Sequence, residues 1–182
     1  MSIHVEESAF VHPSAILEDG VKVWHNAQIR ENAKIGKNVI IGKNVYIGPG
    51  VEIGDNCKIQ NNALIYEPAR LHSGVFIGPG VILTNDKYPR ANNYDGTQKD
   101  AHDWDPVGVE ILDGASIGAN AVCVAPLNIG RWAVVGAGSV VTSDVKGFVL
   151  VVGSPARPVA YVGYEGRVMK KITPRIRYEY YE

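Results

Sequence analysis

Residues 33–65 read AKIGKNVIIGKNVYIGPGVEIGDNCKIQNNALI, and this stretch repeats its pattern at every sixth position. Each unit has a small apolar residue, a medium-sized aliphatic residue two positions later, and then a short segment rich in Gly and Asn. Side chains two positions apart in a strand point to the same side. Gly and Asn adopt the left-handed backbone conformation that tight corners need. Each unit is therefore predicted to be one short strand followed by one corner.

The repeat continues on both sides of this stretch. Every sixth residue from Ala9 to Val81 is small and apolar, and every sixth residue from Val11 to Leu83 is a medium-sized aliphatic. Both columns resume in a shifted frame at Val109. Units that all turn the same way stack these columns into one continuous core, as in solenoid proteins. We therefore predict an all-β, single-stranded parallel β-helix.

This pattern resembles the left-handed β-helix of the hexapeptide-repeat acyltransferases, in which three hexapeptides form one triangular coil. The left-handed winding is implied by this resemblance alone, because the general crossover preference points the other way. With such a coil, residues i and i+18 stack about 4.8 Å apart, as neighbouring strands do.

The composition limits the class of protein. A chain of 182 residues fits one domain, and its 24 Val and 17 Ile against 7 Leu disfavour a helical bundle. The formal net charge of −1 gives no reason to expect a nucleic acid or an anionic membrane as partner. No apolar run is long enough to span a bilayer, and the first ten residues lack the apolar part of a signal peptide. We expect a cytoplasmic protein whose Cys57 and Cys123 fill the core.

Two segments leave the repeat. Residues 84–108 are polar, aromatic and rich in turn residues, and an excursion of this length is typical of a functional loop. We expect the β-helix, with this loop, over residues 1–148 and a C-terminal extension over residues 149–182. Within the extension we predict a short helix at about residues 163–171, ended by Pro174, and a cap or tail in the last residues.

Corners that lose their glycine mark a candidate site. Two neighbouring corner columns read His12, Arg30, Gly48, Tyr66, Thr84 and Pro13, Glu31, Pro49, Glu67, Asn85. Stacking predicts that Glu67 lies one coil from Asn85 and that Arg30 lies two coils from Tyr66. A single polar corner residue is usually only solvated, and for Glu31 and Glu67 the structural and functional interpretations stay equally open. Asn85 and Arg90 favour function because they lie at the start of the loop.

Several segments resemble a narrower group within this family. They are KIQNNALIYE (58–67), GVFIGPGVILTNDKYPRA (74–91), GASIGANAVCVAPLNIG (114–130), VVGAGSVVTSDV (134–145) and VVGSPAR (151–157). They look like the N-acetyltransferases that move acetyl from acetyl-CoA to the 3-amino group of nucleotide-linked amino sugars. The resemblance implies a homotrimer with active sites between neighbouring β-helices, no metal, and a role in the biosynthesis of surface polysaccharides such as lipopolysaccharide.

The resemblance also implies roles for individual residues. Asn85 matches the asparagine that contacts the sugar amine, and Glu67 is our own candidate for a catalytic base. The positions that match the sugar-nucleotide site are Arg30, Glu31, Gln60, Asn62 and Tyr66, and Arg90 is a further candidate for a sugar carboxylate or a pyrophosphate. The positions that match the acetyl-CoA site are Ala119, Ala137, Gly138, Pro155 and Arg157.

The proton acceptor stays open between two routes. Many hexapeptide acyltransferases resemble one another in having a histidine base, but none of the five histidines lies in the TNDKYPR segment (84–90). Either Asn85 orients the amine and the departing CoA sulfur collects the proton, or Glu67 takes it directly or through water.

Other functions stay open as alternatives. An O-acetyltransferase acting on another small acceptor shares the repeat, although an alcohol acceptor needs stronger help from a base. A γ-class carbonic anhydrase also shares the β-helix, but it needs three histidines that converge on zinc, and here the histidines scatter over unrelated columns. A non-enzymatic β-helix would show a regular exposed face, whereas the exposed columns here are mixed.

Overall fold

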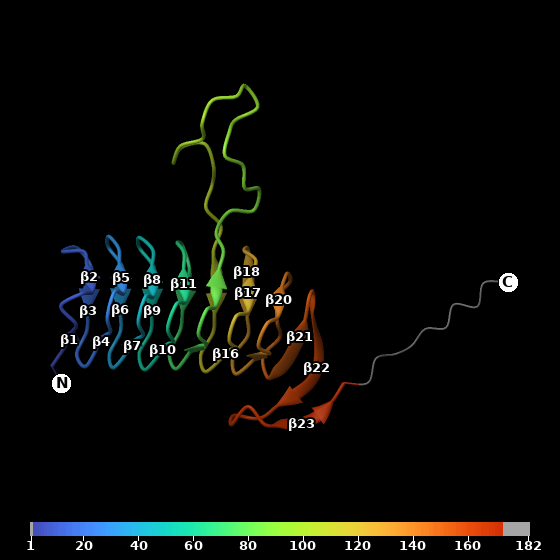
Figure 1. The fold of residues 1–182 in the computed structure, drawn as a ribbon. Helices are drawn as coiled ribbons and strands as arrows, with labels where there is room; N and C mark the ends of the chain where they lie inside the picture. The colour runs from blue at the N-terminus through green and yellow to red at the C-terminus, as the bar shows by residue number, and fades with distance from the viewer. Residues whose placement is uncertain (1, 173–182) are drawn as a thin grey trace.

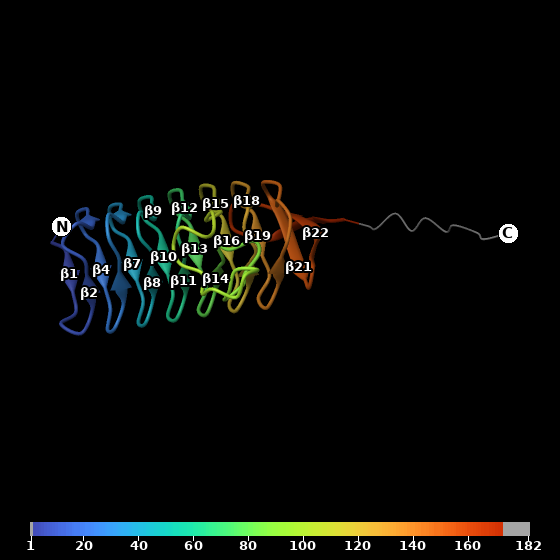
Figure 2. The ribbon, with the colours of Figure 1, turned by 90° about the horizontal axis from the view of Figure 1, so that it is seen from above.

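The computed structural model describes residues 2–172, and these residues wind into a solenoid of short strands (Figure 1). None of the described residues is helical, and successive coils pair in parallel along three sheets, A, B and C. The parallel β-helix predicted from the two apolar columns is confirmed, and it is consistent with the left-handed winding of the resembled family. Residue 2 and the C-terminal strands lie at opposite ends of the solenoid axis (Figures 1 and 2).

Up to β20 the chain passes through sheets A, B and C in turn, so each sheet takes every third strand, and the last three strands all join sheet A. Sheet A contains β1 (His4–Val5), β4 (Lys22–Val23), β7 (Ile40–Ile41), β10 (Lys58–Ile59), β13 (Phe76–Ile77), β16 (Ser116–Ile117), β19 (Val134–Val135), β21 (Val149–Gly153), β22 (Ala156–Val162) and β23 (Val168–Lys171). Sheet B contains β2 (Phe10–Val11), β5 (Gln28–Ile29), β8 (Tyr46–Ile47), β11 (Leu64–Ile65), β14 (Ile82–Leu83), β17 (Val122–Cys123) and β20 (Val140–Val141). Sheet C contains β3 (Ile16–Leu17), β6 (Lys34–Ile35), β9 (Glu52–Ile53), β12 (Arg70–Leu71), β15 (Val109–Ile111) and β18 (Leu127–Ile129).

The register of the coils follows the predicted stacking of residue i on residue i+18. On sheet C, Arg70 pairs with Glu52 of the coil before it, as this rule requires, and with Glu110 of the coil after it. The longer separation from Arg70 to Glu110 contains the loop between β14 and β15, and the solenoid continues after this loop without a change of register. The loop is therefore an insertion into an otherwise regular stack.

The core consists of the two columns that the repeat predicts. Both members of each unit, such as Ala27 and Ile29, are at most 3% exposed through the middle coils. The two cysteines lie in these columns and are fully buried and free, as predicted from their positions. Packing between equivalent residues of successive coils gives each coil the same apolar contacts above and below.

Most corners from Gly20 onward hold one residue in the left-handed conformation, which explains the Asn and Gly of the repeat. Asn44 and Asn62 have φ angles of 56° and 62° in neighbouring coils. Their side chains also form a ladder, because Asn44 Nδ2 donates a hydrogen bond of 3.0 Å to Asn62 Oδ1. These asparagines thus serve both the turn and the contact between coils.

A second device ties corners together, and we call it the cross-coil cap: a side-chain oxygen of residue i+18 accepts the backbone N–H of residue i. The N–H of Lys37 donates to Asp55 Oδ1 at 2.7 Å, and the N–H of Lys43 donates to Asn61 Oδ1 at 2.9 Å. The residue before each lysine is glycine, because a Cβ atom there would lie 2.5 or 2.6 Å from the capping oxygen.

The C-terminal segment corrects one prediction. The helix predicted at about residues 163–171 is wrong, because residues 168–171 form β23, which pairs antiparallel with β22. A turn joins these two strands: the N–H of Gly163 donates to the carbonyl of Arg167 at 3.0 Å, and Gly166 has a φ of 73°. The strand forms because β22 offers it a free edge. Pro174 and the last residues, for which we predicted a helix stop and a cap or tail, lie outside the described residues.

An aromatic cluster fixes this hairpin to the solenoid. Tyr164 packs edge-on against Trp132 and Phe148, with ring centroids 5.0 and 5.2 Å away. Trp132 has a φ of 56°, and its indole lies directly over Gly114 of the coil below. In the part of the chain that the structure describes, no helix has the length and apolar character needed to cross a membrane.

Candidate active site

The corner between sheets B and C, which we call the B–C corner, carries the loop. The chain leaves β14 at this corner and returns to β15, and the loop extends well clear of the coils (Figure 1). The loop closes at its base, where the N–H of Val107 donates to the carbonyl of Asn85 at 2.9 Å. Asn85 therefore lies at the neck of the loop, next to the corner side chains of the coils below.

Arg30 and Glu31 form a two-pronged ion pair at this corner. Arg30 Nε donates to Glu31 Oε2 at 2.9 Å, and Arg30 Nη2 donates to Glu31 Oε1 at 3.0 Å. The hydrogen bond to Glu31 is the largest cause that raises the pKa of Arg30, and the guanidinium in turn lowers the pKa of Glu31. Both side chains stay about one-third exposed, so the fork presents fixed charges to solvent.

Two tyrosines continue the cluster into the next coils. The rings of Tyr46 and Tyr66 lie 5.1 Å apart, and both residues are half-buried. Burial raises the pKa of Tyr46, and the nearby carboxylate of Glu67 raises it further, while the charge of Arg30 and a hydrogen bond to it act in the opposite direction. Tyr46 thus interacts with both Arg30 and Tyr66, which the sequence predicts to lie two coils apart. Our sequence reasoning missed this residue, although it stacks with Gln28 and Leu64 in one outward column.

Glu67 holds an unusual carboxylate at this corner. Its Oε2 atom is buried and has no hydrogen-bond partner, the one such side-chain oxygen or nitrogen found among residues 2–172. The oxygen lies over Gly48 of the coil below, in contact with the position that a Cβ atom would take there. A buried acceptor without a donor costs about 1–3 kcal/mol, so its retention points to a role in function.

The register also places Glu67 one coil below Asn85. Ile65 and Leu83, which precede these two residues by two positions, pair with each other. The carboxylate, however, turns toward Gly48 in the coil beneath and thus away from Asn85. Arg90 lies further along the loop, is exposed, and donates to the carbonyl of Pro89 at 2.9 Å. The guanidinium of Arg90 thus engages the backbone of its own loop.

Five other predicted residues gather at a different edge of sheet B, the corner between sheets A and B, which we call the A–B corner. They are Gln60, Asn62, Ala119, Ala137 and Gly138. Asn62 has a clear structural role in the asparagine ladder. Gly138 has a φ of 68° and open space around it. Their proposed ligand contacts stay predictions, and within one chain they lie across sheet B from the B–C corner.

Sheet B, which separates these two corners, has an apolar outer surface. Its outward residues from the third coil upward are Tyr46, Leu64, Ile82, Val122 and Val140, and all are half-buried. The equivalent outward residues of sheet C are charged or polar, among them Lys34, Glu52, Arg70 and Glu110. A continuous apolar strip on one face of a solenoid is typical of an interaction surface.

Pro155 and Arg157 lie in the turn and first part of the β21–β22 hairpin, at the C-terminal end of the solenoid. Arg157 Nη1 donates to the carbonyl of Ala156 at 3.0 Å. Arg157 also lines a hollow of about 530 Å³ between the last coil and the hairpin, together with Lys146 and Tyr161. Arg157 of the hairpin and Lys146 of the preceding turn thus place two cationic side chains beside this hollow.

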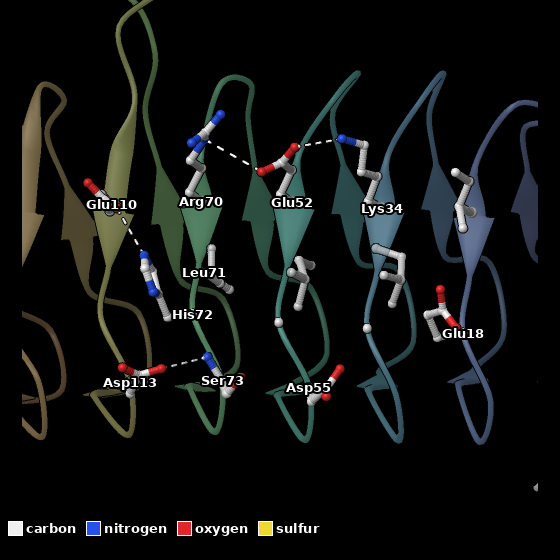
Figure 3. A pocket seen from close by; sticks show the side chains of 15 residues that line it. Glu18, Lys34, Glu52, Asp55, Arg70, Leu71, His72, Ser73, Glu110 and Asp113 are labelled. Atoms are coloured by element: carbon white, nitrogen blue, oxygen red, sulfur yellow. Dashed lines mark hydrogen bonds and ion pairs between the residues drawn. The ribbon is translucent and has the colours of Figure 1, made fainter.

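A larger groove of about 660 Å³ runs along sheet C, away from every predicted site residue (Figure 3). Its walls carry two ion pairs, Lys34 to Glu52 at 2.9 Å and Arg70 to Glu52 at 3.7 Å, and a hydrogen bond of 2.9 Å between His72 Nε2 and Glu110 Oε1. These exposed charges satisfy one another, and such pairs contribute little individually. Among the described residues, no three His, Cys, Asp or Glu side chains come together to hold a metal ion.

Comparison with protein families matches the repeat directly. The family described as "Bacterial transferase hexapeptide (six repeats)" matches residues 14–49, 32–67 and 50–85. The family described as "Hexapeptide repeat of succinyl-transferase" matches residues 107–143. These matches cover the solenoid on both sides of the loop. The chain belongs to the hexapeptide-repeat transferase family.

Curated members of related sequence match parts of this hexapeptide-repeat protein. A dTDP-3-amino-3,6-dideoxy-alpha-D-galactopyranose 3-N-acetyltransferase of Aneurinibacillus thermoaerophilus is 56% identical over 52 residues, which cover 29% of this chain and 27% of that protein. The bifunctional protein GlmU of Cellvibrio japonicus is 45% identical over 84 residues, which cover 46% of this chain and 15% of that protein. The chain thus matches less than a third of the length of these relatives.

Solved structures share the architecture of this hexapeptide-repeat protein. A hexapeptide-repeat acetyltransferase of Vibrio cholerae O1 biovar eltor, complexed with acetyl coenzyme A, is 25% identical with a TM-score of 0.57, and the match covers 71% of this chain and 70% of that one. A second structure of the Vibrio cholerae protein is 30% identical with a TM-score of 0.53, and the match covers 62% of each chain. A maltose O-acetyltransferase of Clostridium difficile 630 shares the fold at 22% identity and a TM-score of 0.60, covering 71% of this chain and 69% of that one.

Proposed function

We propose that this hexapeptide-repeat protein transfers acetyl from acetyl-CoA to the amine, at the 3-position, of a nucleotide-linked amino sugar. The observation that carries the proposal is the B–C corner, where Arg30, Glu31, Tyr66 and Glu67 gather below the loop that begins at Asn85. The 56% identity to a sugar 3-N-acetyltransferase over 52 residues supports the reaction. The fold shared with an acetyltransferase that was solved with acetyl coenzyme A supports the donor.

The reaction asks little of the protein. A neutral amine attacks the thioester carbonyl, so the site must align the two substrates, support the developing oxyanion and let one proton leave. In our proposal Asn85 orients the amine at the neck of the loop. The fork of Arg30 and Glu31 and the face of Tyr66 hold the sugar nucleotide, whose pyrophosphate or sugar carboxylate suits Arg30 or Arg90.

The donor half of the site would lie at the A–B corner. Small residues such as Ala119, Ala137 and Gly138 leave room along the upper coils for the pantetheine arm of acetyl-CoA. Pro155 and Arg157 at the hairpin would receive the nucleotide end, where a guanidinium suits phosphate. Gln60 and Asn62 belong to the sugar-nucleotide half in this proposal, although they lie on the same corner as the donor residues.

Because Asn85 and the Arg30–Glu31 pair lie across sheet B from the donor residues and from Gln60 and Asn62, we propose that the site is completed between copies of the chain. A closed ring of three copies, each using its apolar sheet B at the centre, would bring the B–C corner of one copy to the A–B corner of the next. The outward column of Leu64, Ile82 and Val122 supports this arrangement because it offers an apolar strip between the two halves.

The assay for this function measures release of free CoA thiol from acetyl-CoA with a panel of UDP- and dTDP-linked amino sugars. We expect release with at least one 3-amino sugar and none with its 3-hydroxy counterpart. Asn85→Ala is expected to lower kcat/KM about 100-fold, the order of loss that follows misplacement of a reacting group. Asn92→Ala, in the same loop and exposed, is the matched control and should stay near wild type. The absence of thiol release with every amino sugar, or one bound zinc per chain, would overturn the proposal.

The assembly is tested by sedimentation of two variants. Ile82→Glu places a charge on the apolar strip of sheet B and is expected to give monomers without activity. Ser116→Glu changes an outward strand residue of sheet A with the same degree of burial and should leave the trimer intact. A wild-type protein that sediments as an active monomer would contradict the shared site.

The substrates also suggest where the protein works. Acetyl-CoA and nucleotide-linked sugars are made inside the cell, so we propose a cytoplasmic enzyme that prepares an acetylated sugar for a surface polysaccharide. Cell fractionation tests the location, and recovery of the protein outside the cytoplasmic fraction would refute it.

A further inference from the structure

Pro49 breaks the cross-coil cap at one place, below Glu67. Three successive corners, at Gly36, Gly42 and Gly48, receive an acidic or amide side chain from the coil above. In the first two corners the following residue is a lysine, whose N–H binds the capping oxygen at 2.7 or 2.9 Å. In the third corner the following residue is Pro49, which has no N–H to donate.

This missing donor explains the buried Oε2 atom of Glu67. The carboxylate occupies the hollow over Gly48 as Asp55 occupies the hollow over Gly36, but it finds no hydrogen bond there. Glu67 is also one methylene longer than Asp55, so its carboxylate has more freedom to leave the hollow. A buried carboxylate oxygen without a hydrogen-bond donor destabilises the folded protein. A bound molecule can supply that donor.

The surroundings favour an amine as that donor. Tyr46 lies within electrostatic reach of Glu67, and the cation of Arg30 is held on both prongs by Glu31. Glu67 therefore has no cation of its own among the described side chains of this corner. The amino group of the acceptor has N–H donors for this carboxylate, and it releases a proton when it is acetylated.

We propose that Pro49 keeps the carboxylate of Glu67 free of the backbone, so that Glu67 binds the amino group of the acceptor and takes the proton released on acetylation. This inference rests on the proposed function and assigns the proton acceptor that the sequence leaves open. Glu67 is then a catalytic residue, and Pro49 is a positioning residue that acts through it.

The step balances with the two substrates alone. The lone pair of the neutral amine forms the C–N bond with the thioester carbonyl, and the C–S bond of acetyl-CoA breaks with its electrons going to sulfur. One N–H proton passes from the amine to the carboxylate of Glu67. The carboxylic acid then gives this proton to the CoA thiolate, which leaves as the thiol and restores the carboxylate.

The test combines Pro49→Ala, Glu67→Gln and the double variant in the thiol-release assay. Glu67→Gln is expected to lower kcat at least about 100-fold and to remove the acidic limb of the kcat–pH profile. Pro49→Ala supplies the missing N–H and should lower kcat/KM about 10- to 100-fold, the factor for one hydrogen bond to a charged group. In the Glu67→Gln background, Pro49→Ala should have little further effect.

The control is Pro79→Ala, which follows Gly78 in the same way but lies below Ala119, a residue with no acceptor side chain. It should keep wild-type kinetics. The other titratable groups at the B–C corner and at the start of the loop are His12, Glu31, Tyr46, Tyr66 and Asp86, so the loss of the acidic limb must be specific to Glu67→Gln and absent from Glu31→Gln.

A second readout needs no activity. In Pro49→Ala, the new amide of residue 49 should be protected from hydrogen exchange, and Glu67→Ala should remove this protection. A wild-type protein that releases no thiol would end the proposed function and this inference together. An active wild type with normal kcat and pH profile in Glu67→Gln, or an equal loss from Pro49→Ala with and without Glu67, would overturn the inference alone.

Discussion

Gly48→Ala tests whether the hollow beneath Glu67 matters. The added Cβ atom would contact Glu67 Oε2, and it would also lie 2.9 Å from the backbone nitrogen of Glu67 and 3.4 Å from the carbonyl oxygen of Ile65. The carboxylate can rotate away, but the backbone nitrogen cannot, so two neighbouring coils must separate by a few tenths of an ångström. The backbone of Gly48 is not left-handed, so alanine adds no torsional strain there.

The expected cost follows from these contacts. Overpacking of this kind costs about 1–3 kcal/mol, and the reduced entropy of the unfolded alanine chain returns about 0.4–1 kcal/mol. A net loss of about 1–2 kcal/mol should lower Tm by roughly 2–8 °C for a chain of this size. The displaced carboxylate should lower kcat/KM about 100-fold in the thiol-release assay, as misplacement of a reacting group does.

Gly50→Ala separates stability from activity. Gly50 has no atom within 4 Å of an added Cβ but has a φ of 65°, so alanine there costs about 1–2 kcal/mol of backbone strain and displaces nothing. Thermal unfolding by circular dichroism should show similar losses for both variants, with activity kept only in Gly50→Ala. A Gly48→Ala protein with wild-type Tm and wild-type kcat/KM would refute the reasoning.

Three further predictions concern other parts of the structure. Gly114→Ala should lower the free energy of unfolding in urea by about 2–4 kcal/mol, because Gly114 has a φ of 69° and the added Cβ would lie 2.5 Å from the indole of Trp132. In a Trp132→Asn background this loss should fall by about half. An undiminished loss would argue against the steric cause. Burial raises the pKa of Cys57 to about 11 and that of Cys123 to about 12, so neither thiol should react with a disulfide reagent at pH 8 until the protein unfolds. The contribution of these thiols to stability is complete below their ordinary pKa of 9 and is lost as pH rises through the raised values. Rapid labelling of the native protein would contradict this prediction. Arg30 lowers the pKa of Glu31 below its ordinary 4.5, so the contribution of this pair to stability is present above pH 4.5 and is lost as pH falls through the lowered value. In an NMR titration, Arg30→Gln should return the pKa of Glu31 toward 4.5. An unchanged titration would show that Arg30 is not the cause of the shift.

The fold could be predicted from the sequence because the same six-residue pattern occurs in many successive units. The period of six places Ile29 and Ile47 in one column without any knowledge of tertiary structure, and both are fully buried. The segment 168–171 lacks this support. It becomes a strand only because it pairs with β22, and it carries none of the six-residue periodicity that indicates the strands of the solenoid.

The site could be predicted only in part for a related reason. Stacking of residue i on residue i+18 brought Arg30, Tyr66 and Glu67 to one corner, but it fixed backbone positions and not side-chain directions. Glu67 turns toward the coil beneath because Gly48 leaves space there, and its carboxylate lacks a partner because Pro49 follows. Such an effect appears only when a corner is compared with the corners that precede it.

The loop between β14 and β15 has a consequence for how this protein can diversify. Both ends of the insertion meet at one hydrogen bond between Val107 and Asn85, and the strands on either side keep their pairing as if the inserted segment were absent. An insert held at a single closed neck can lengthen, shorten or be exchanged between relatives without repacking the core, as surface loops generally tolerate. We therefore expect that changes in the length or sequence of this segment leave the stacking of the coils unchanged.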